Sequence, residues 1–124
     1  MNFSEDLEAV FKQERGRSDA ATDRGAAAFD RLLTLAEERD SGQIACIAHF
    51  IACVYDGETY RWDPFELRML DVEISDDMLA CLDALRWGQH DLPGLVPDGE
   101  RRVRDVLRRW RLLAADRNEI SRWQ

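Results

Sequence analysis

The sequence predicts an all-α protein: a single compact domain of five to six helices around one buried central helix at about residues 43–56. Three observations lead to this prediction. Apolar residues recur at helical spacing in most segments of the 124-residue chain. Residues that cap or end helices, such as Asn, Ser, Asp, Gly and Pro, separate those segments. The length and the 45% hydrophobic content fit one ordinary globular domain.

The first third of the chain predicts two helices separated by a loop. Asn2 or Ser4 can cap the first helix. The segment 15–19 (Arg-Gly-Arg-Ser-Asp) is expected to end it, so residues 1–19 form a peripheral helix and loop. A second helix is predicted from about residue 20 to 38. The apolar face of the first helix has four members, spaced i, i+4, i+7 and i+8: Phe3, Leu7, Val10 and Phe11.

The middle of the chain predicts the central helix and a short one. Residues 43–56 are apolar on nearly every side, which is typical of a helix buried in the centre of its domain. Residues 58–62 alternate and favour a short extended segment, but a lone strand has nothing to pair with. A short helix follows at about 63–71, where Asp63 can cap and Pro64 occupies the first position.

The last third predicts two more helices. Ser75 is expected to cap a helix over residues 76–87, with Gly88 after its end. Residues 89–99 contain two Pro and two Gly and are expected to form a loop. A final helix is predicted from Glu100 to Ala115 or beyond. Its apolar stripe consists of Val103, Val106, Leu107, Trp110 and Leu113.

Charge is segregated along the chain. Residues 1–99 carry 21 acids against 9 bases, and residues 100–124 carry 8 bases against 4 acids. The domain, residues 1–124, is therefore expected to consist of an acidic body and a basic C-terminal helix at 100–124. The net charge of −8 disfavours nucleic acid as a partner, because counterion release requires a basic footprint.

The C-terminal helix carries the first candidate interaction surface. Four Arg residues fall within about an 80° arc that points away from the apolar stripe. Such an arc can bind phosphates or an acidic protein surface. The alternative is a solvated face that pairs with the acidic body. The four residues are Arg101, Arg104, Arg108 and Arg111.

A cluster of acids forms the second candidate surface. Spaced carboxylates can imitate a phosphate backbone and occupy a basic groove on another protein. The alternative is structural, because acids in the first turn stabilise a helix by ~0.3–1 kcal/mol each. The cluster comprises Asp71, Glu73, Asp76 and Asp77.

Two further clusters have a structural and a functional interpretation. Cys46, His49 and Cys53 share one helix face and could bind zinc, with Cys81 or His90 as a fourth ligand. Their spacing differs from that of a zinc knuckle, so a core face with a hydrogen-bonded His is expected, and no metal or cofactor is assigned. An aromatic cluster is expected to pack on the core, or else to bind a partner: Tyr55, Tyr60, Trp62 and Phe65.

Several short motifs resemble those of a family of small, uncharacterised bacterial proteins, a domain of unknown function often met on plasmids and other mobile elements. They include Leu-Leu-Thr-Leu-Ala at 32–36, Asp-Ser-Gly-Gln at 40–43 and Phe-Glu-Leu-Arg-Met-Leu-Asp at 65–71. The resemblance runs over residues 24–113. It implies no activity, cofactor or catalytic residue, but it favours an accessory role on a mobile element.

The sequence contains no P-loop, dinucleotide fingerprint or catalytic triad pattern, so no enzyme is predicted. We expect a cytoplasmic protein, because the N-terminus lacks the pattern of a signal peptide and no apolar run is long enough for a membrane. The expected function is a non-enzymatic protein-interaction module, in its narrowest form an anti-CRISPR-like inhibitor of a bacterial defence complex. The alternative is a nucleic-acid-associated regulator that uses the C-terminal Arg stripe.

Overall fold

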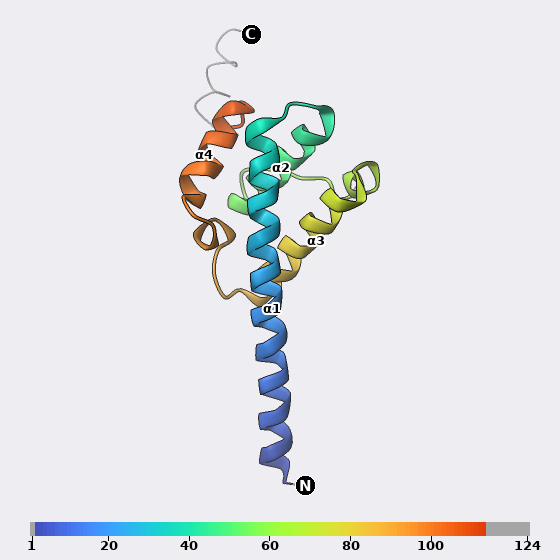
Figure 1. Cartoon of the computed structure of the whole chain (residues 1–124), viewed down its shortest axis with the longest axis vertical. Coiled ribbons are helices and arrows are strands. Elements are labelled where there is room, and N and C mark those ends of the chain that lie inside the picture. The colour runs from blue at the N-terminus through green and yellow to red at the C-terminus, as the bar shows by residue number, and fades with distance from the viewer. Residues whose placement is uncertain (1, 114–124) are drawn as a thin grey trace.

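The computed structural model describes residues 2–113, which contain four α-helices, two 3-10 helices and no strand (Figure 1). This confirms the all-α prediction. No described helix combines the length and the apolar character needed to span a membrane. The elements in chain order are α1 (Phe3–Glu38), α2 (Gly42–Tyr55), η1 (Pro64–Met69), α3 (Val72–Trp87), η2 (Leu92–Leu95) and α4 (Gly99–Arg109).

Helix α1 is one continuous helix of 36 residues, roughly 54 Å long. The predicted break at residues 15–19 was therefore wrong. A helical Gly such as Gly16 costs only about 1 kcal/mol, and contacts just beyond it hold the helix together. The Thr22 hydroxyl donates to the carbonyl of Ser18 (2.8 Å), and the Gln89 side-chain amide donates to the Ser18 hydroxyl (2.6 Å).

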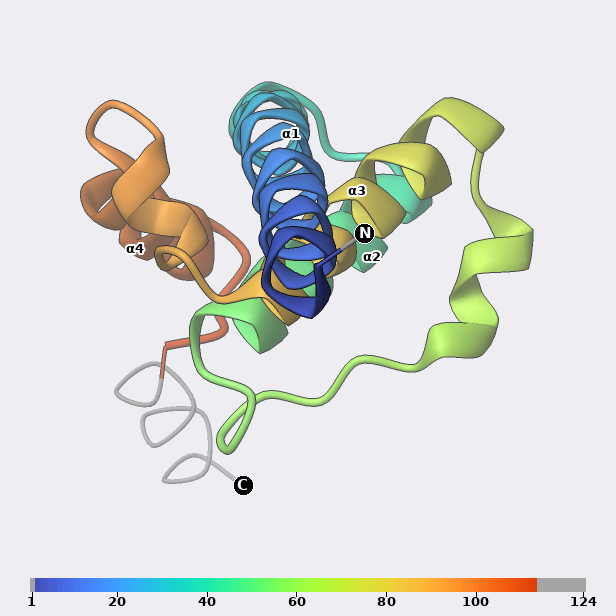
Figure 2. The same cartoon turned by 90° about the horizontal axis from the view of Figure 1, so that it is seen from below.

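Helix α1 is also the element that organises the core. From residue 18 onward it has buried residues, and it contacts α2, α3, α4 and η2. Viewed along α1, α4 lies on one side of it and α3 on the other (Figure 2). Helix α2 lies in the core as predicted, with six buried residues. The predicted central helix is thus buried, and α1 packs against each of the other three α-helices.

The α1–α3 contact depends on a glycine. A Cβ built on Gly25 would lie 2.4 Å from the Cβ of Ala84 and 3.1 Å from the carbonyl oxygen of Ala80. The buried Cys81 thiol also faces the carbonyl of Gly25, at 3.8 Å. Only a residue without a side chain allows the two backbones this close. Gly25, which by propensity alone weakens α1, is therefore a packing requirement.

The helix starts in the middle of the chain differ in part from the prediction. The Asp63 carboxylate accepts from the backbone N–H of Phe65 (3.0 Å), so η1 begins as predicted, but it is a 3-10 helix and ends at Met69. Helix α3 begins at Val72 rather than residue 76. The backbone N–H of Asp71 donates to the Gln43 side chain of α2 (2.8 Å), which fixes the earlier start.

Of the two capping residues predicted for α3, one prediction was wrong and the other is confirmed. Ser75 is not a cap: its hydroxyl lies within the first turn and donates to the carbonyl of Val72 (2.9 Å). Gly88 ends the helix as predicted, in the left-handed conformation with φ of 64°. Residues 89–99 are not only loop, because they contain η2, and α4 already begins at Gly99.

Helix α4 ends well before the predicted end near Ala115, a residue outside the described range. Two hydrogen bonds close its last turn: Leu112 N–H donates to the carbonyl of Leu107 (2.7 Å), and Arg111 N–H donates to that of Arg108 (3.1 Å). Arg111 has a φ of 57°. This is the Schellman motif, with Arg where Gly is usual. Because Arg is not a typical helix stop, sequence patterns do not predict this end.

The substitution Gly25→Ala is expected to lower the free energy of unfolding by about 1–3 kcal/mol, because the added methyl group overpacks the α1–α3 contact. Urea denaturation of purified protein measures this change. The matched control is Gly16→Ala, which meets no heavy atom within 4 Å and should be neutral or stabilising by up to about 1 kcal/mol. Equal stability of the two variants would contradict the close packing at Gly25.

Candidate protein-interaction surfaces

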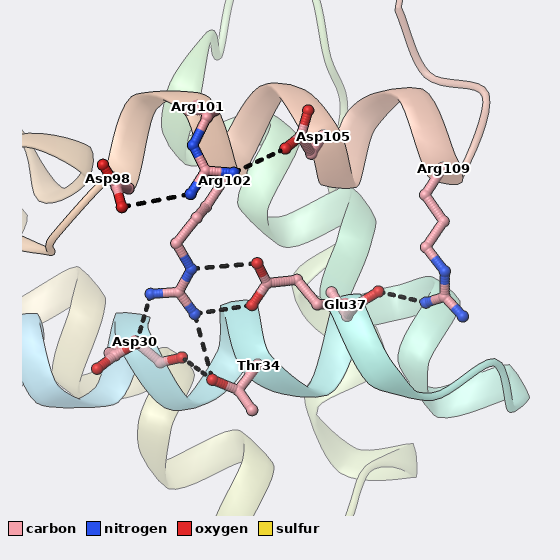
Figure 3. Close-up of polar contacts among 9 residues, drawn as sticks. Asp30, Thr34, Glu37, Asp98, Arg101, Arg102, Asp105 and Arg109 are labelled. Carbon is pink, nitrogen blue, oxygen red and sulfur yellow. Dashed lines mark hydrogen bonds and ion pairs between the residues drawn. The ribbon is translucent and has the colours of Figure 1, made fainter.

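The outward face of α4 carries bases, two of which pair with an acid of α4 or with its N-cap residue. Arg101 forms ion pairs with Asp98 (3.3 Å) and Asp105 (3.2 Å), as Figure 3 shows. Arg108 binds the same Asp105 carboxylate (3.0 Å). Arg104 is exposed and forms no hydrogen bond or ion pair through its side chain with any described residue. The acid at position 105 thus interrupts the predicted basic stripe.

The fourth member of the predicted stripe lies off the helix. Arg111 follows the C-cap residue Trp110, and its left-handed backbone turns the chain away from the α4 axis. It lines a pocket together with His49, Tyr60 and Arg61. The structure therefore places three of the four Arg residues on one helix and does not continue the stripe to the fourth.

The polar contact of Arg102 with α1 was not predicted from the sequence. The Arg102 side chain, only 16% exposed, binds Asp30 (2.6 Å), Glu37 (2.7 and 3.1 Å) and Thr34 (3.2 Å) on α1 (Figure 3). Hydrogen bonding to Glu37 raises the pKa of Arg102 above its usual value. Two carboxylates, two turns apart on α1, therefore enclose one guanidinium.

Two further side chains complete this α1–α4 seam. Arg109 donates to the backbone carbonyls of Ala36 and Arg39 at the end of α1, and the Trp110 indole N–H donates to the Ala36 carbonyl (3.0 Å). These bonds satisfy C-terminal carbonyls that a helix leaves without partners. A sequence signal did exist: Asp30 and Glu37 are seven apart, as are the bases at positions 102 and 109.

Two acids of the acidic cluster contact neighbouring helices, and the other two are exposed. Asp77 forms a bidentate ion pair with Arg31 of α1 (2.8 and 3.1 Å), and Asp71 accepts a hydrogen bond from Gln43 of α2 (3.4 Å). These two acids orient α3 on its neighbours. Glu73 and Asp76 are exposed. The four predicted residues are thus close together at the start of α3, and two of them, Glu73 and Asp76, form no side-chain hydrogen bond or ion pair with a described residue.

The cysteine–histidine face of α2 differs from the expected core face. His49 is exposed, so the prediction of a hydrogen-bonded core His was wrong, while Cys46 and Cys53 are only partly buried. Burial raises the pKa of the Cys81 thiol to about 12 and also raises that of Cys46. Within residues 2–113, no three His, Cys, Asp or Glu side chains are grouped to bind a metal ion.

Most of the aromatic cluster packs on the core, as expected. The Trp62 ring meets Phe50 of α2 edge to face, with centroids 5.0 Å apart, and Tyr55 and Tyr60 are partly buried against the same core. Phe65 is the exception, because 69% of it is exposed. The packing prediction is confirmed for three of the four residues and wrong for the fourth.

The N-terminal part of α1 carries an exposed apolar face. Every residue from 3 to 16, here called the α1 arm, is exposed, and the arm extends away from the other helices (Figure 1). No side-chain hydrogen bond or ion pair joins it to another described element. Four large apolar side chains share one of its faces, with exposed fractions of 39–76%: Phe3, Leu7, Val10 and Phe11.

The sequence identified this apolar face but not its exposure. Helical spacing shows which side chains share a face, whereas contact with another element depends on the position of the whole helix. The expected loop at residues 15–19 would have let the first helix fold back on the core. Because α1 is continuous, the arm instead points into solvent.

The substitution Arg102→Ala is expected to lower the free energy of unfolding by about 1–3 kcal/mol, since it removes charge-assisted hydrogen bonds and leaves two carboxylates facing each other. Arg104→Ala, an equal truncation on the exposed side of α4, should change it by less than about 0.5 kcal/mol. Urea or thermal denaturation measures both. Similar losses in the two variants would show that the seam does not depend on Arg102.

Neither a curated protein nor a solved structure matches the chain. One family model does, over residues 26–111, and it is described as a family of unknown function (DUF7673). The matched region runs from the α1–α3 contact to just beyond the end of α4, and the α1 arm lies before it. The resemblance to an uncharacterised domain is thereby confirmed. The chain belongs to this family of unknown function.

Proposed function

We propose that the protein is a non-enzymatic protein-interaction module and that the α1 arm is its docking element. The observation that carries the proposal is the exposed apolar face of the arm. Phe3 is 76% exposed and Phe11 is 57% exposed. Aromatic side chains contribute most of the energy in many protein interfaces. A contiguous apolar face of this kind, on a helical segment that packs on nothing, is typical of a binding surface.

The spacing of this face indicates the type of partner surface. Anchors at i, i+4, i+7 and i+8 form one stripe along a helix, which is how amphipathic helices bind a groove or another helix. The arm is the continuation of the buried part of α1, so the core holds its direction. The arm therefore presents its stripe on a supported helix rather than on a loose terminal segment.

The charge pairing supports a protein partner over nucleic acid. Arg102 and Arg109 bind α1, and Arg101 and Arg108 share the carboxylate of Asp105. These contacts reduce the number of guanidinium groups that could replace counterions on a phosphate backbone. The geometry therefore supports the alternative, a nucleic-acid regulator, less than it supports protein binding by the arm.

A photo-crosslinking amino acid at position 11, in protein expressed in its native host, is expected to form covalent adducts with protein. The same group at position 12 is the control, because Lys12 lies about 100° from Phe11 around the helix, outside the apolar face. Gel shift and mass spectrometry identify the adducts. Equal yields at the two positions, or adducts with nucleic acid at position 11, would contradict the proposal.

The exposed acids of α3 support a narrower form of this proposal: an accessory protein of a mobile element that inhibits a bacterial defence complex. Glu73 and Asp76 are exposed beside Val72, which is itself 72% exposed. Carboxylates beside an apolar side chain suit the basic groove in which a defence protein holds nucleic acid.

In bacteria with an active CRISPR system, expression of the protein is expected to raise the plating efficiency of a targeted phage. The double substitution Glu73→Lys and Asp76→Lys should abolish this effect, because it reverses the charge of the exposed acids. Glu58→Lys, a reversal at an exposed residue in the turn after α2, serves as the control. If the original protein does not change the plating efficiency, the proposal of a defence inhibitor is wrong, whereas the proposal that the α1 arm binds a protein is unaffected.

A further inference from the structure

We propose that the pocket between the second half of α2, the turn after it and the end of α4 binds a small phosphate monoester. The pocket has a volume of about 320 Å³. It includes no residue of the α1 arm, so this inference does not depend on the proposed function. We call it the α2–α4 pocket, and seven residues line it: His49, Ala52, Thr59, Tyr60, Arg61, Arg111 and Leu112.

The charge of the α2–α4 pocket is opposite to that of the whole chain. Two Arg and one His line it and no acid does, although the chain carries a net charge of −8. Two other pockets of the described residues do contain acids. Glu38 and Glu73 line one of them, and Asp91 and Glu100 line the other. A concave site lined by cations raises the local concentration of anions, so the ligand expected here is anionic.

Four polar side chains of this pocket have no partner within the described part of the chain. None of them forms a side-chain hydrogen bond or an ion pair with residues 2–113. In α4, by contrast, Arg102 binds two carboxylates of α1. The donor groups of the pocket are therefore available to a ligand. The four side chains belong to His49, Tyr60, Arg61 and Arg111.

The backbone on both sides of the pocket is held in place by hydrogen bonds. In the turn after α2, the Tyr60 N–H donates to the carbonyl of Asp56 (3.0 Å), and the Thr59 hydroxyl donates to the Asp56 carboxylate (2.6 Å). At the end of α4, the Leu112 N–H donates to the carbonyl of Leu107 (2.7 Å). A site that is formed before its ligand arrives loses less entropy on binding.

The backbone of Arg111 gives an independent indication of a ligand. Its φ of 57° lies in the left-handed region, which glycine adopts freely and which is costly for a residue with a side chain. Glycine is also the usual residue at this position of a helix end. No hydrogen bond or ion pair of the Arg111 side chain within residues 2–113 offsets this cost. Such strain is concentrated at ligand sites, and an anion in the pocket would provide the missing contact.

The lining residues favour a phosphate group attached to an organic body. A guanidinium presents its N–H groups in a planar fork that matches two phosphate oxygens, and the His and Tyr side chains add further donors. A water molecule takes up about 30 Å³ in the liquid, so a phosphate group alone fills only part of 320 Å³. Ala52, Leu112 and the Tyr60 ring offer apolar surface for the remainder, which is about the size of a mononucleotide.

NMR of the histidine rings in the untagged full chain tests this site with AMP as the probe. The chain contains two His residues, and H90Q assigns their signals because it leaves His49 alone. AMP should shift the His49 signal saturably, with a dissociation constant on the order of 0.1–1 mM, and should leave His90 unchanged. The absence of a saturable His49 shift up to about 10 mM AMP, or an equal shift of both signals, would overturn the site.

Substitutions of the two guanidinium groups test their roles. R61Q and R111G should each weaken AMP binding at least about tenfold, because each removes charge-assisted hydrogen bonds. R104Q, the loss of an exposed Arg outside the pocket, should change it less than about twofold. R111G should also melt at the same or a higher temperature, because glycine relieves the left-handed strain. Unchanged AMP binding in both R61Q and R111G would overturn the proposal.

Three further ligands test the class of molecule that the pocket recognises. Adenosine lacks the phosphate and succinate is a dianion without phosphate, so each should bind at least about tenfold more weakly than AMP. Equal binding of either one would overturn the phosphate monoester as the ligand. A single-stranded DNA oligonucleotide should compete with AMP no better than AMP itself does. Competition at least about tenfold stronger, lost as salt is raised, would assign the pocket to nucleic acid and overturn the small ligand.

Discussion

The close contact between α1 and α3 at Gly25 is the constraint on which the rest of the fold depends. A side chain at this position would meet Ala84 at 2.4 Å, so the two helices can pack only with glycine there. Once α3 lies against α1, the Arg31–Asp77 ion pair and the hydrogen bond between Gln43 and Asp71 fix how α2 and α3 are placed along it. The hydrophobic core forms around these contacts.

The basic C-terminal helix is explained mainly as a structural element. Its apolar stripe docks on the body through Val103, Val106 and Leu107, all buried. Arg102 then places its charge between two carboxylates of α1, where bidentate geometry makes the hydrogen bonds stronger than those of an exposed pair. The segregation of charge along the sequence is therefore resolved partly within the molecule, across the α1–α4 seam.

The α1 arm has no such structural explanation. Buried contacts begin at Ser18, and the residues before it contribute nothing to the core. An exposed amphipathic helix with four large apolar side chains is unfavourable in water unless another surface covers it. For these reasons the arm, rather than the Arg stripe or the acidic cluster, is the strongest candidate for a functional surface.

Local periodicity and capping were sufficient to predict the all-α class, the buried α2 helix, the start of η1 at Asp63 and the end of α3 at Gly88. They also identified the apolar face of the arm, though not its exposure, and the acidic cluster at the start of α3. Only the folded chain shows four other features: the continuity of α1, the start of α3 at Val72, the end of α4 at Arg109 and the role of Arg102. Most of these features depend on contacts between residues far apart in the sequence, which propensity and spacing do not encode.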